Sequence, residues 1–177
     1  MRIHETEIGG VFVVEPEPIR DERGFFARVF CVDEFAAAGL ITEFVQSSVS
    51  FNEQAGTLRG LHFQAEPHAE TKLVRCTRGA IFDVVVDLRP DSPTYRRWLS
   101  RELTADNRLA LYIPPGCAHG FQTLVAASEV LYHITPRYHA PSARGVRWND
   151  PAFGIVWPPA ERRILSERDS SYPDVRE

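Results

Sequence analysis

The chain has 177 residues, of which 44% are hydrophobic, and it carries a formal net charge of −4. This length and apolar content fit one domain over residues 1–177 with a sizeable core. The acidic balance argues against nucleic acid as a partner, and no segment reaches the roughly 20 consecutive apolar residues that would span a bilayer.

Thirteen prolines and eleven glycines divide the chain into short runs that are rich in β-branched and aromatic residues. These runs predict strands at Val11–Val14, Phe25–Phe30, Phe44–Phe51, Thr57–Phe63, Lys72–Thr77, Ala80–Leu88, Trp98–Leu103, Ala110–Ile113, Gly120–Leu124 and Val130–Ile134. Residues 33–39 predict a short helix with Asp33 as its N-cap and Gly39 at its end. Many short strands with frequent turns favour a sandwich or a jelly-roll barrel, around which the proline-rich tail from Asn149 would wrap.

Four polar side chains fall on strand faces that are otherwise largely apolar. Because side chains alternate between the two faces of a strand, His62, Lys72, Asp83 and Tyr132 each share a face with apolar neighbours. A single polar residue in such a place is usually a hydrogen-bonded core group. Four of them on neighbouring strands of a small barrel fit the lining of a cavity equally well, and alternation alone leaves both interpretations open.

Lys72 is the only lysine in a chain that carries 19 arginines. Under such a bias, a retained lysine indicates a position where a compact ammonium is needed and a guanidinium does not fit. Chance is the plain alternative.

A metal centre is a competing interpretation of this cavity. Residues 114–119 look like the second half of a cupin signature, in which His119 is often a metal ligand. The first half should supply a His-x-His pair and a following Glu, but Gln64 stands where the second His belongs, and His68 and Glu70 have the wrong spacing. A catalytic metal normally needs about three protein ligands, so we predict neither a metal nor a cofactor.

The cysteines and the first residues of the chain indicate the compartment. Cys31, Cys76 and Cys117 are odd in number and lack Cys-x-x-Cys spacing, which predicts reduced thiols. The first ten residues contain no apolar stretch typical of a signal peptide. Both features predict a cytoplasmic protein.

Six short blocks run in order from about Arg23 to Asp169, nearly the whole chain. The blocks are DERGFF from Asp21, GTLRGLHFQ from Gly56, KLVRC from Lys72, IPPGCAHGF from Ile113, WNDP from Trp148 and SERD from Ser166. In this order they resemble the dTDP-4-dehydrorhamnose 3,5-epimerase family. The resemblance implies an all-β, cupin-type jelly-roll barrel with short flanking helices and no metal. It also implies a homodimer whose N-terminal strands exchange between subunits.

Carried over by position, the resemblance assigns roles to individual residues. It makes His62 the general base, held by Asp169, and Tyr132 the acid on the opposite face of the sugar. Lys72 would face the oxygen that becomes the enolate. The remaining predicted contacts are Arg59 and His119 in the same pocket, Arg23, Phe26 and Gln46 against the nucleotide and its phosphates, and Tyr138 stacked on the base.

The implied reaction inverts C3, C5 or both in a 4-keto-6-deoxy sugar linked to a nucleoside diphosphate. A proton beside a ketone is weakly acidic, so its removal needs a base that works near neutral pH and a fixed cation where negative charge develops. Alternatives are a nucleotide-sugar 3,4-ketoisomerase, a non-catalytic sugar-binding jelly roll and a metal-dependent cupin oxygenase. The presence of Tyr132 together with the His62 and Lys72 blocks favours epimerisation.

Overall fold

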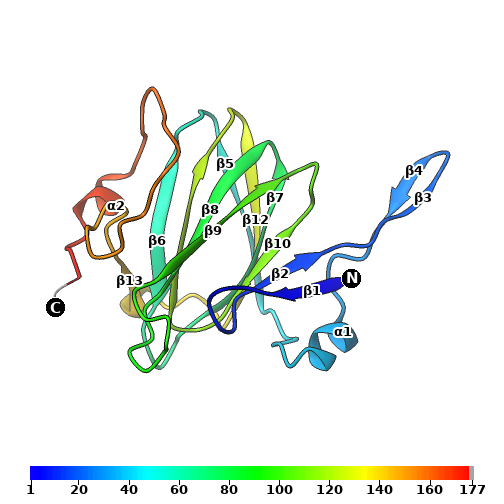
Figure 1. The fold of residues 1–177 in the computed structure, drawn as a ribbon, viewed down its shortest axis with the longest axis horizontal. Helices are drawn as coiled ribbons and strands as arrows, with labels where there is room; N and C mark the ends of the chain where they lie inside the picture. The colour runs from blue at the N-terminus through cyan, green and yellow to red at the C-terminus, as the bar shows by residue number, and fades with distance from the viewer. Residues whose placement is uncertain (176–177) are drawn as a thin grey trace.

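Two antiparallel β-sheets face each other and form the body of the molecule (Figure 1). The computed structural model describes residues 1–175, with β1 (Arg2–Glu5), β2 (Phe12–Glu15), β3 (Ile19–Asp21), β4 (Gly24–Phe26), α1 (Val32–Ala37), β5 (Gln46–Asn52), β6 (Leu58–Gln64), β7 (Thr71–Arg78), β8 (Ala80–Asp87), β9 (Trp98–Thr104), β10 (Ala110–Ile113), β11 (Cys117–Thr123), β12 (Ser128–Thr135), a 3₁₀ turn (Ala140–Ser142), β13 (Ala143–Gly145) and α2 (Glu167–Ser171). One sheet has the order β1-β2-β10-β7-β12-β5 and the other β13-β6-β11-β8-β9. The predicted all-β jelly-roll barrel with short flanking helices is confirmed.

The core lies between the two sheets and follows from side-chain alternation. Val74 on β7, Val85 on β8, Leu111 on β10 and Phe121 on β11 are almost completely buried in one apolar cluster. Each belongs to a strand whose alternate residues point to the other face. Burial of this apolar surface is the main stabilising contribution to the barrel.

The C-terminal tail covers the outer face of the five-stranded sheet. Phe153 and Trp157 pack there against Val84 and Val86 of β8 and against Leu58 of β6. β8 is therefore buried on both faces, which explains its almost uninterrupted apolar sequence. The prediction that the tail wraps the barrel is confirmed, with the addition of the short helix α2.

The helix α1 covers the outer face of the six-stranded sheet through Phe35, which is completely buried. Its predicted N-cap is wrong: Cys31 occupies the cap without a side-chain hydrogen bond, and Asp33 lies in the first turn. There the carboxylate still interacts favourably with the helix dipole. The predicted end is confirmed, since Gly39 has a φ of 71°, which glycine adopts without strain.

The hairpin of β3 and β4 projects away from the body of the molecule (Figure 1). Ile19 and Phe26 on this hairpin are 74% and 75% exposed. The strand predicted over Phe25–Phe30 is wrong beyond Phe26, because residues 27–31 pair with no strand among the described residues. The other predicted strands are present, although β11 begins at Cys117 rather than Gly120, while β1, β3 and β13 were not predicted.

No helix within residues 1–175 is long and apolar enough to cross a membrane.

The strands β6 and β11 approach each other closely at two glycines, Gly60 and Gly120. Gly60 has a φ of 132°, and a Cβ atom added to it would lie 2.5 Å from the Cα of Gly120. We expect Gly60→Ala to lower the free energy of unfolding by about 2–4 kcal/mol, because backbone atoms must move and alanine is strained at this φ. Urea denaturation measures the change. Gly9→Ala is the control, since its added Cβ meets nothing within 4 Å, and equal stability of the two variants would contradict the prediction.

Candidate active site

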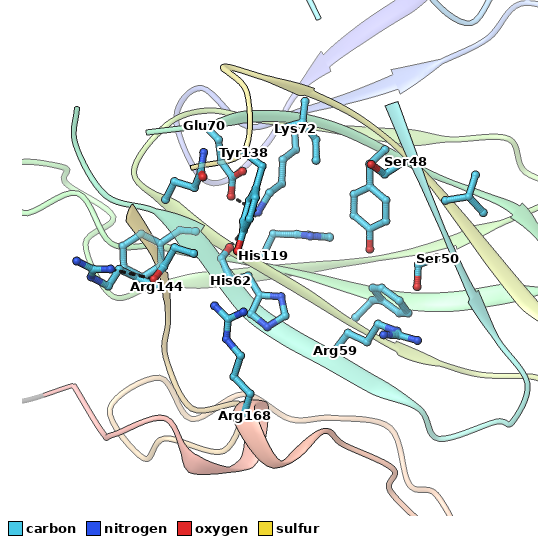
Figure 2. A pocket seen from close by; sticks show the side chains of 17 residues that line it. Ser48, Ser50, Arg59, His62, Glu70, Lys72, His119, Tyr138, Arg144 and Arg168 are labelled. Carbon is cyan, nitrogen blue, oxygen red and sulfur yellow. Dashed lines mark hydrogen bonds and ion pairs between the residues drawn. The ribbon is translucent and has the colours of Figure 1, made fainter. Parts of the chain in front are cut away.

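A cavity of about 330 Å³ lies between the two sheets (Figure 2). β5, β7 and β12 supply residues to one wall, and β6 and β11 supply the other. The predicted site residues that line it are His62, Lys72, Tyr132, Arg59, His119 and Tyr138. Side chains from five strands therefore meet at one cavity. Strand alternation alone could not distinguish such a cavity from a hydrogen-bonded core.

His62 on β6 is held by a carboxylate from the C-terminal tail. Its Nε2 lies 2.7 Å from Oδ1 of Asp169, and the His62 side chain is 39% exposed while that of Asp169 is 6% exposed. An ionised carboxylate only accepts hydrogen bonds, so Nε2 carries the proton and Nδ1 keeps its lone pair. The pair thus leaves Nδ1 as the basic nitrogen of His62.

Asp169 is fixed by the first turn of α2. Ser166 caps this helix by accepting a hydrogen bond from the Asp169 N–H, and the Gly60 N–H donates to Oδ2 of Asp169 at 3.2 Å. Burial by itself would raise the pKa of Asp169, but the hydrogen bonds from His62 and Gly60 outweigh burial and hold the pKa below its usual value. Asp169 is therefore a stable carboxylate at neutral pH.

Lys72 on β7 has its ammonium group inside the barrel wall. Its Nζ donates to the carbonyl oxygen of His62 at 3.0 Å and lies 2.9 Å from Oε1 of Glu70. Both side chains are less than 10% exposed, at 8% for Lys72 and 9% for Glu70. A positive charge is thereby fixed next to His62.

A second His–carboxylate pair lies on β11 and β8, which follow β6 in the order of the five-stranded sheet. Nε2 of His119 on β11 is 2.8 Å from Oδ1 of Asp83 on β8, and Asp83 is completely buried. Burial raises the pKa of Asp83, against the opposing effect of His119 and Lys72. Strand alternation predicts that Asp83 shares a face with apolar neighbours, but no sequence pattern predicts its contact with His119.

Tyr132 on β12 comes from the sheet opposite His62. Its ring meets that of His119 edge to face, with centroids 6.0 Å apart. Burial raises the pKa of the Tyr132 hydroxyl, and the charge of Asp83 adds to the effect. The phenol therefore keeps its proton until a strong base accepts it.

The remaining predicted residues divide into two groups. Gln46 does not line the cavity but accepts a hydrogen bond from the Tyr138 N–H at 3.1 Å, which holds Tyr138 at the cavity. Arg23 and Phe26 lie on the projecting hairpin, where Arg23 pairs with Asp21. The structure does not bring these two residues to the cavity of their own chain.

Three charged residues line the cavity without having been predicted. Arg168 reaches from α2 toward His62, while Arg144 and Glu70 come from β13 and from the segment between β6 and β7 (Figure 2). Two of these residues, Arg168 and Glu70, could have been predicted from the sequence. Arg168 directly precedes Asp169 in a matching block, and Glu70 lies two residues before Lys72, on the same face of an extended chain.

Within residues 1–175, no group of three or more His, Cys, Asp or Glu side chains is arranged to hold a metal ion. His119, the candidate metal ligand of the cupin signature, is hydrogen-bonded to Asp83.

Known proteins are similar to this chain in sequence and in fold over nearly its whole length. The family model for dTDP-4-dehydrorhamnose 3,5-epimerase matches residues 5–177. The chain belongs to this family. A dTDP-4-dehydrorhamnose 3,5-epimerase from Sinorhizobium fredii is 46% identical over 177 residues, which cover 100% of this chain and 91% of that relative. The dTDP-4-dehydrorhamnose 3,5-epimerase of Bacillus anthracis, solved with TDP and PPi bound, superposes with a TM-score of 0.94 at 42% identity and covers 98% of this chain and 99% of its own.

One relative has a name that specifies epimerisation at C3 only. A dTDP-4-dehydrorhamnose 3-epimerase from Streptomyces niveus is 38% identical over 170 residues, or 96% of this chain and 81% of that relative. Membership of the epimerase family thus establishes an isomerase with a cupin-like jelly-roll fold, and it leaves the number of inverted centres to experiment.

The Asp169 carboxylate predicts a pH-dependent stability. Because the pKa of Asp169 is lower in the folded protein than in the unfolded chain, its ionised form stabilises the fold above the unfolded pKa, and the stabilisation is lost as the pH falls through the folded pKa. We expect wild type to be more stable than Asp169→Asn at pH 7 and the difference to shrink below about pH 4. Urea denaturation between pH 3 and pH 7 measures it. Asp91→Asn, in an exposed turn, is the control, and a difference that stays constant with pH would refute the assignment.

Proposed function

We propose that the chain epimerises C3, C5 or both in a dTDP-linked 4-keto-6-deoxy hexose, by proton removal and return through an enolate. The observation that carries the proposal is the arrangement of His62, Lys72 and Tyr132 around one cavity. A base held by a carboxylate, a fixed ammonium and a protonated phenol are the three groups that this chemistry requires.

His62 is the base. Nδ1 takes the proton from the carbon beside the ketone, and Asp169 stabilises the imidazolium that forms. The electron pair of the broken C–H bond becomes the C=C bond of the enolate, and negative charge moves onto the oxygen at C4. C3 and C5 both flank C4, so one cation at this oxygen serves either position, and Lys72 supplies it.

Tyr132 is the acid. It projects from β12, in the sheet opposite β6, and so supports reprotonation from the face opposite to His62. Its raised pKa suits a donor that gives up its proton only to a strong base such as the enolate carbon. The resulting tyrosinate regains a proton from solvent and the imidazolium releases one, so the cycle is balanced.

The polar residues around the cavity mouth fit a nucleoside diphosphate. Arg59, Arg144 and Arg168 all line the cavity, and guanidinium groups bind phosphate oxygens in a bidentate manner. Tyr138 is 55% exposed at the same place, which leaves a ring face free to stack on a base. We place the enzyme in the cytoplasm, in keeping with its three unpaired cysteines.

We further propose a homodimer that exchanges the β3–β4 hairpins. Phe26 is 75% exposed on this hairpin, and β5 is an edge strand with Val49 and Phe51 about half exposed, at 58% and 47%. An exposed apolar edge strand favours pairing with another chain. The hairpin of one subunit would then carry Arg23 and Phe26 to the cavity of the other.

The two steps of the reaction are separable by mutation. We expect His62→Ala to abolish both deuterium uptake from D₂O and inversion, since no proton leaves. Tyr132→Phe keeps the packing ring but lacks the hydroxyl, so His62 still forms the enolate and returns a proton to the same face. In this variant exchange should outrun inversion by about 10²-fold or more, the usual contribution of a general acid.

Proton NMR of dTDP-4-keto-6-deoxyglucose in D₂O measures both rates and shows which centres invert. Wild type, in which the two rates are similar, is the reference. Loss of exchange and inversion to the same extent in Tyr132→Phe would show that Tyr132 is not a dedicated acid. Full activity of His62→Ala would refute the proposed mechanism as a whole.

Exchange of the hairpins predicts complementation between two inactive variants. In a mixed dimer of His62→Ala and Arg23→Ala, one site receives both defects and the other receives neither. Unfolding and refolding an equal mixture should restore about one quarter of the wild-type activity, because half of the dimers are mixed and each has one intact site. Each variant refolded alone is the control. No recovery, while light scattering shows dimers, would place Arg23 at the site of its own chain.

A further inference from the structure

The ammonium group of Lys72 has three N–H donors, and two of them are already used. One donates to the His62 carbonyl at 3.0 Å, and one points to Glu70 Oε1 at 2.9 Å (Figure 2). Because the donors are tetrahedrally arranged, two fixed partners also fix the direction of the third. Lys72 lines the cavity, so the third donor is the one left for a bound molecule.

We propose that Glu70 is a positioning residue that keeps Lys72 charged and aims its free N–H at the oxygen that becomes the enolate. The inference rests on the proposed function, because it assigns a purpose to the ammonium within that reaction. Glu70 belongs to none of the blocks that resemble the family, and the sequence presents it only as a metal-ligand candidate with the wrong spacing.

The charge on Glu70 matters because a neutral amine would satisfy the same two acceptors. A deprotonated Lys72 has two N–H groups, enough for His62 and Glu70, and its lone pair would then face the cavity. A lone pair repels an enolate oxygen, whereas an ammonium stabilises it. Burial of an ammonium is unfavourable unless an opposite charge is close, and among residues 1–175 Glu70 is the carboxylate that forms an ion pair with Nζ.

Other titratable groups also face Lys72, but none is placed to replace Glu70. Asp83 on β8 interacts with Lys72 electrostatically, but its Oδ1 is hydrogen-bonded to His119 and its Oδ2 has no hydrogen-bond partner, so the ion pair of Nζ is with Glu70. Burial raises the pKa of the Cys117 thiol to about 12, so it stays neutral. The remaining charged or titratable groups that line the same cavity come from other elements and form no ion pair with Nζ: His62 and Arg59 on β6, His119 on β11, Tyr132 on β12, Tyr138, Arg144 on β13 and Arg168 on α2.

The pairing also explains the residue type at position 72. Glu70 precedes Lys72 by two residues and lies beside Nζ, within a wall that leaves both side chains less than a tenth exposed. A planar guanidinium would need more partners in a wider fork than this site offers. The single lysine of the chain therefore stands where a compact charge is required.

Because Lys72 is the only lysine among 177 residues, it can be observed without any substrate. Protein labelled with [ε-¹³C]lysine gives one side-chain resonance, whose chemical shift follows the protonation of the amine. We expect the alkaline transition of this resonance to move to lower pH by about 1–3 units in Glu70→Gln, since a nearby opposite charge has an effect of this size. Glu70→Asp keeps the charge and should stay close to wild type. An unchanged transition in Glu70→Gln would overturn the proposal.

The second measurement is the pH dependence of epimerisation. Glu70→Gln should keep KM within about threefold but lower kcat by about tenfold or more at pH 8–9, with recovery toward lower pH as the amine is protonated. Glu66→Gln, the same substitution at an exposed position of the same segment, is the matched control and should behave as wild type. A raised KM with unchanged kcat would instead assign Glu70 to substrate binding.

The two measurements separate this proposal from the proposed function. If wild type fails to epimerise the sugar while the lysine resonance still responds to Glu70→Gln, the pairing holds and the reaction is wrong. If wild type is active but neither readout responds to Glu70→Gln, the reaction holds and the role of Glu70 is wrong.

Discussion

Charged side chains inside a small β-barrel must be paired, and this constraint shapes the whole site. Three basic side chains enter the cavity wall, and each has a carboxylate partner: His62 with Asp169, Lys72 with Glu70 and His119 with Asp83. An unpaired charge at these positions would destabilise the barrel by several kcal/mol. In all three pairs the basic residue lines the cavity, and Asp83 and Asp169 lie behind it.

In this arrangement the carboxylates contribute to stability, while their basic partners line the cavity. The buried carboxylates compensate the charge and fix the orientation of their partners, so the basic groups reach the cavity already oriented. The substrate proposed here is an anion that becomes more negative as it reacts. A wall in which each basic side chain reaches the cavity together with its own carboxylate partner suits both states.

The sequence predicted the barrel and the centre of the site better than the residues that support them. Alternation placed His62, Lys72 and Tyr132 on inward faces, and ordered blocks gave them roles, because strand periodicity and short motifs are local properties. The partners of these residues were harder to find. The contact of Asp83 with His119 joins residues 36 apart, and nothing in the local pattern of β8 marks it. The N-cap at Cys31 and the end of β4 at Phe26 were mispredicted for a related reason, since packing and the absence of a partner strand decided them.

The contact between His62 and Asp169 spans 107 residues and joins the barrel to the tail. All described strands precede α2 in the chain, so a ribosome adds them before it adds the carboxylate that holds His62. The barrel core and the pair of His62 and Asp169 therefore depend on segments that are synthesised at different times. A chain whose barrel has formed around Val74 and Leu111 still lacks the proposed base–carboxylate pair until the tail docks on the outer sheet and Asp169 reaches His62.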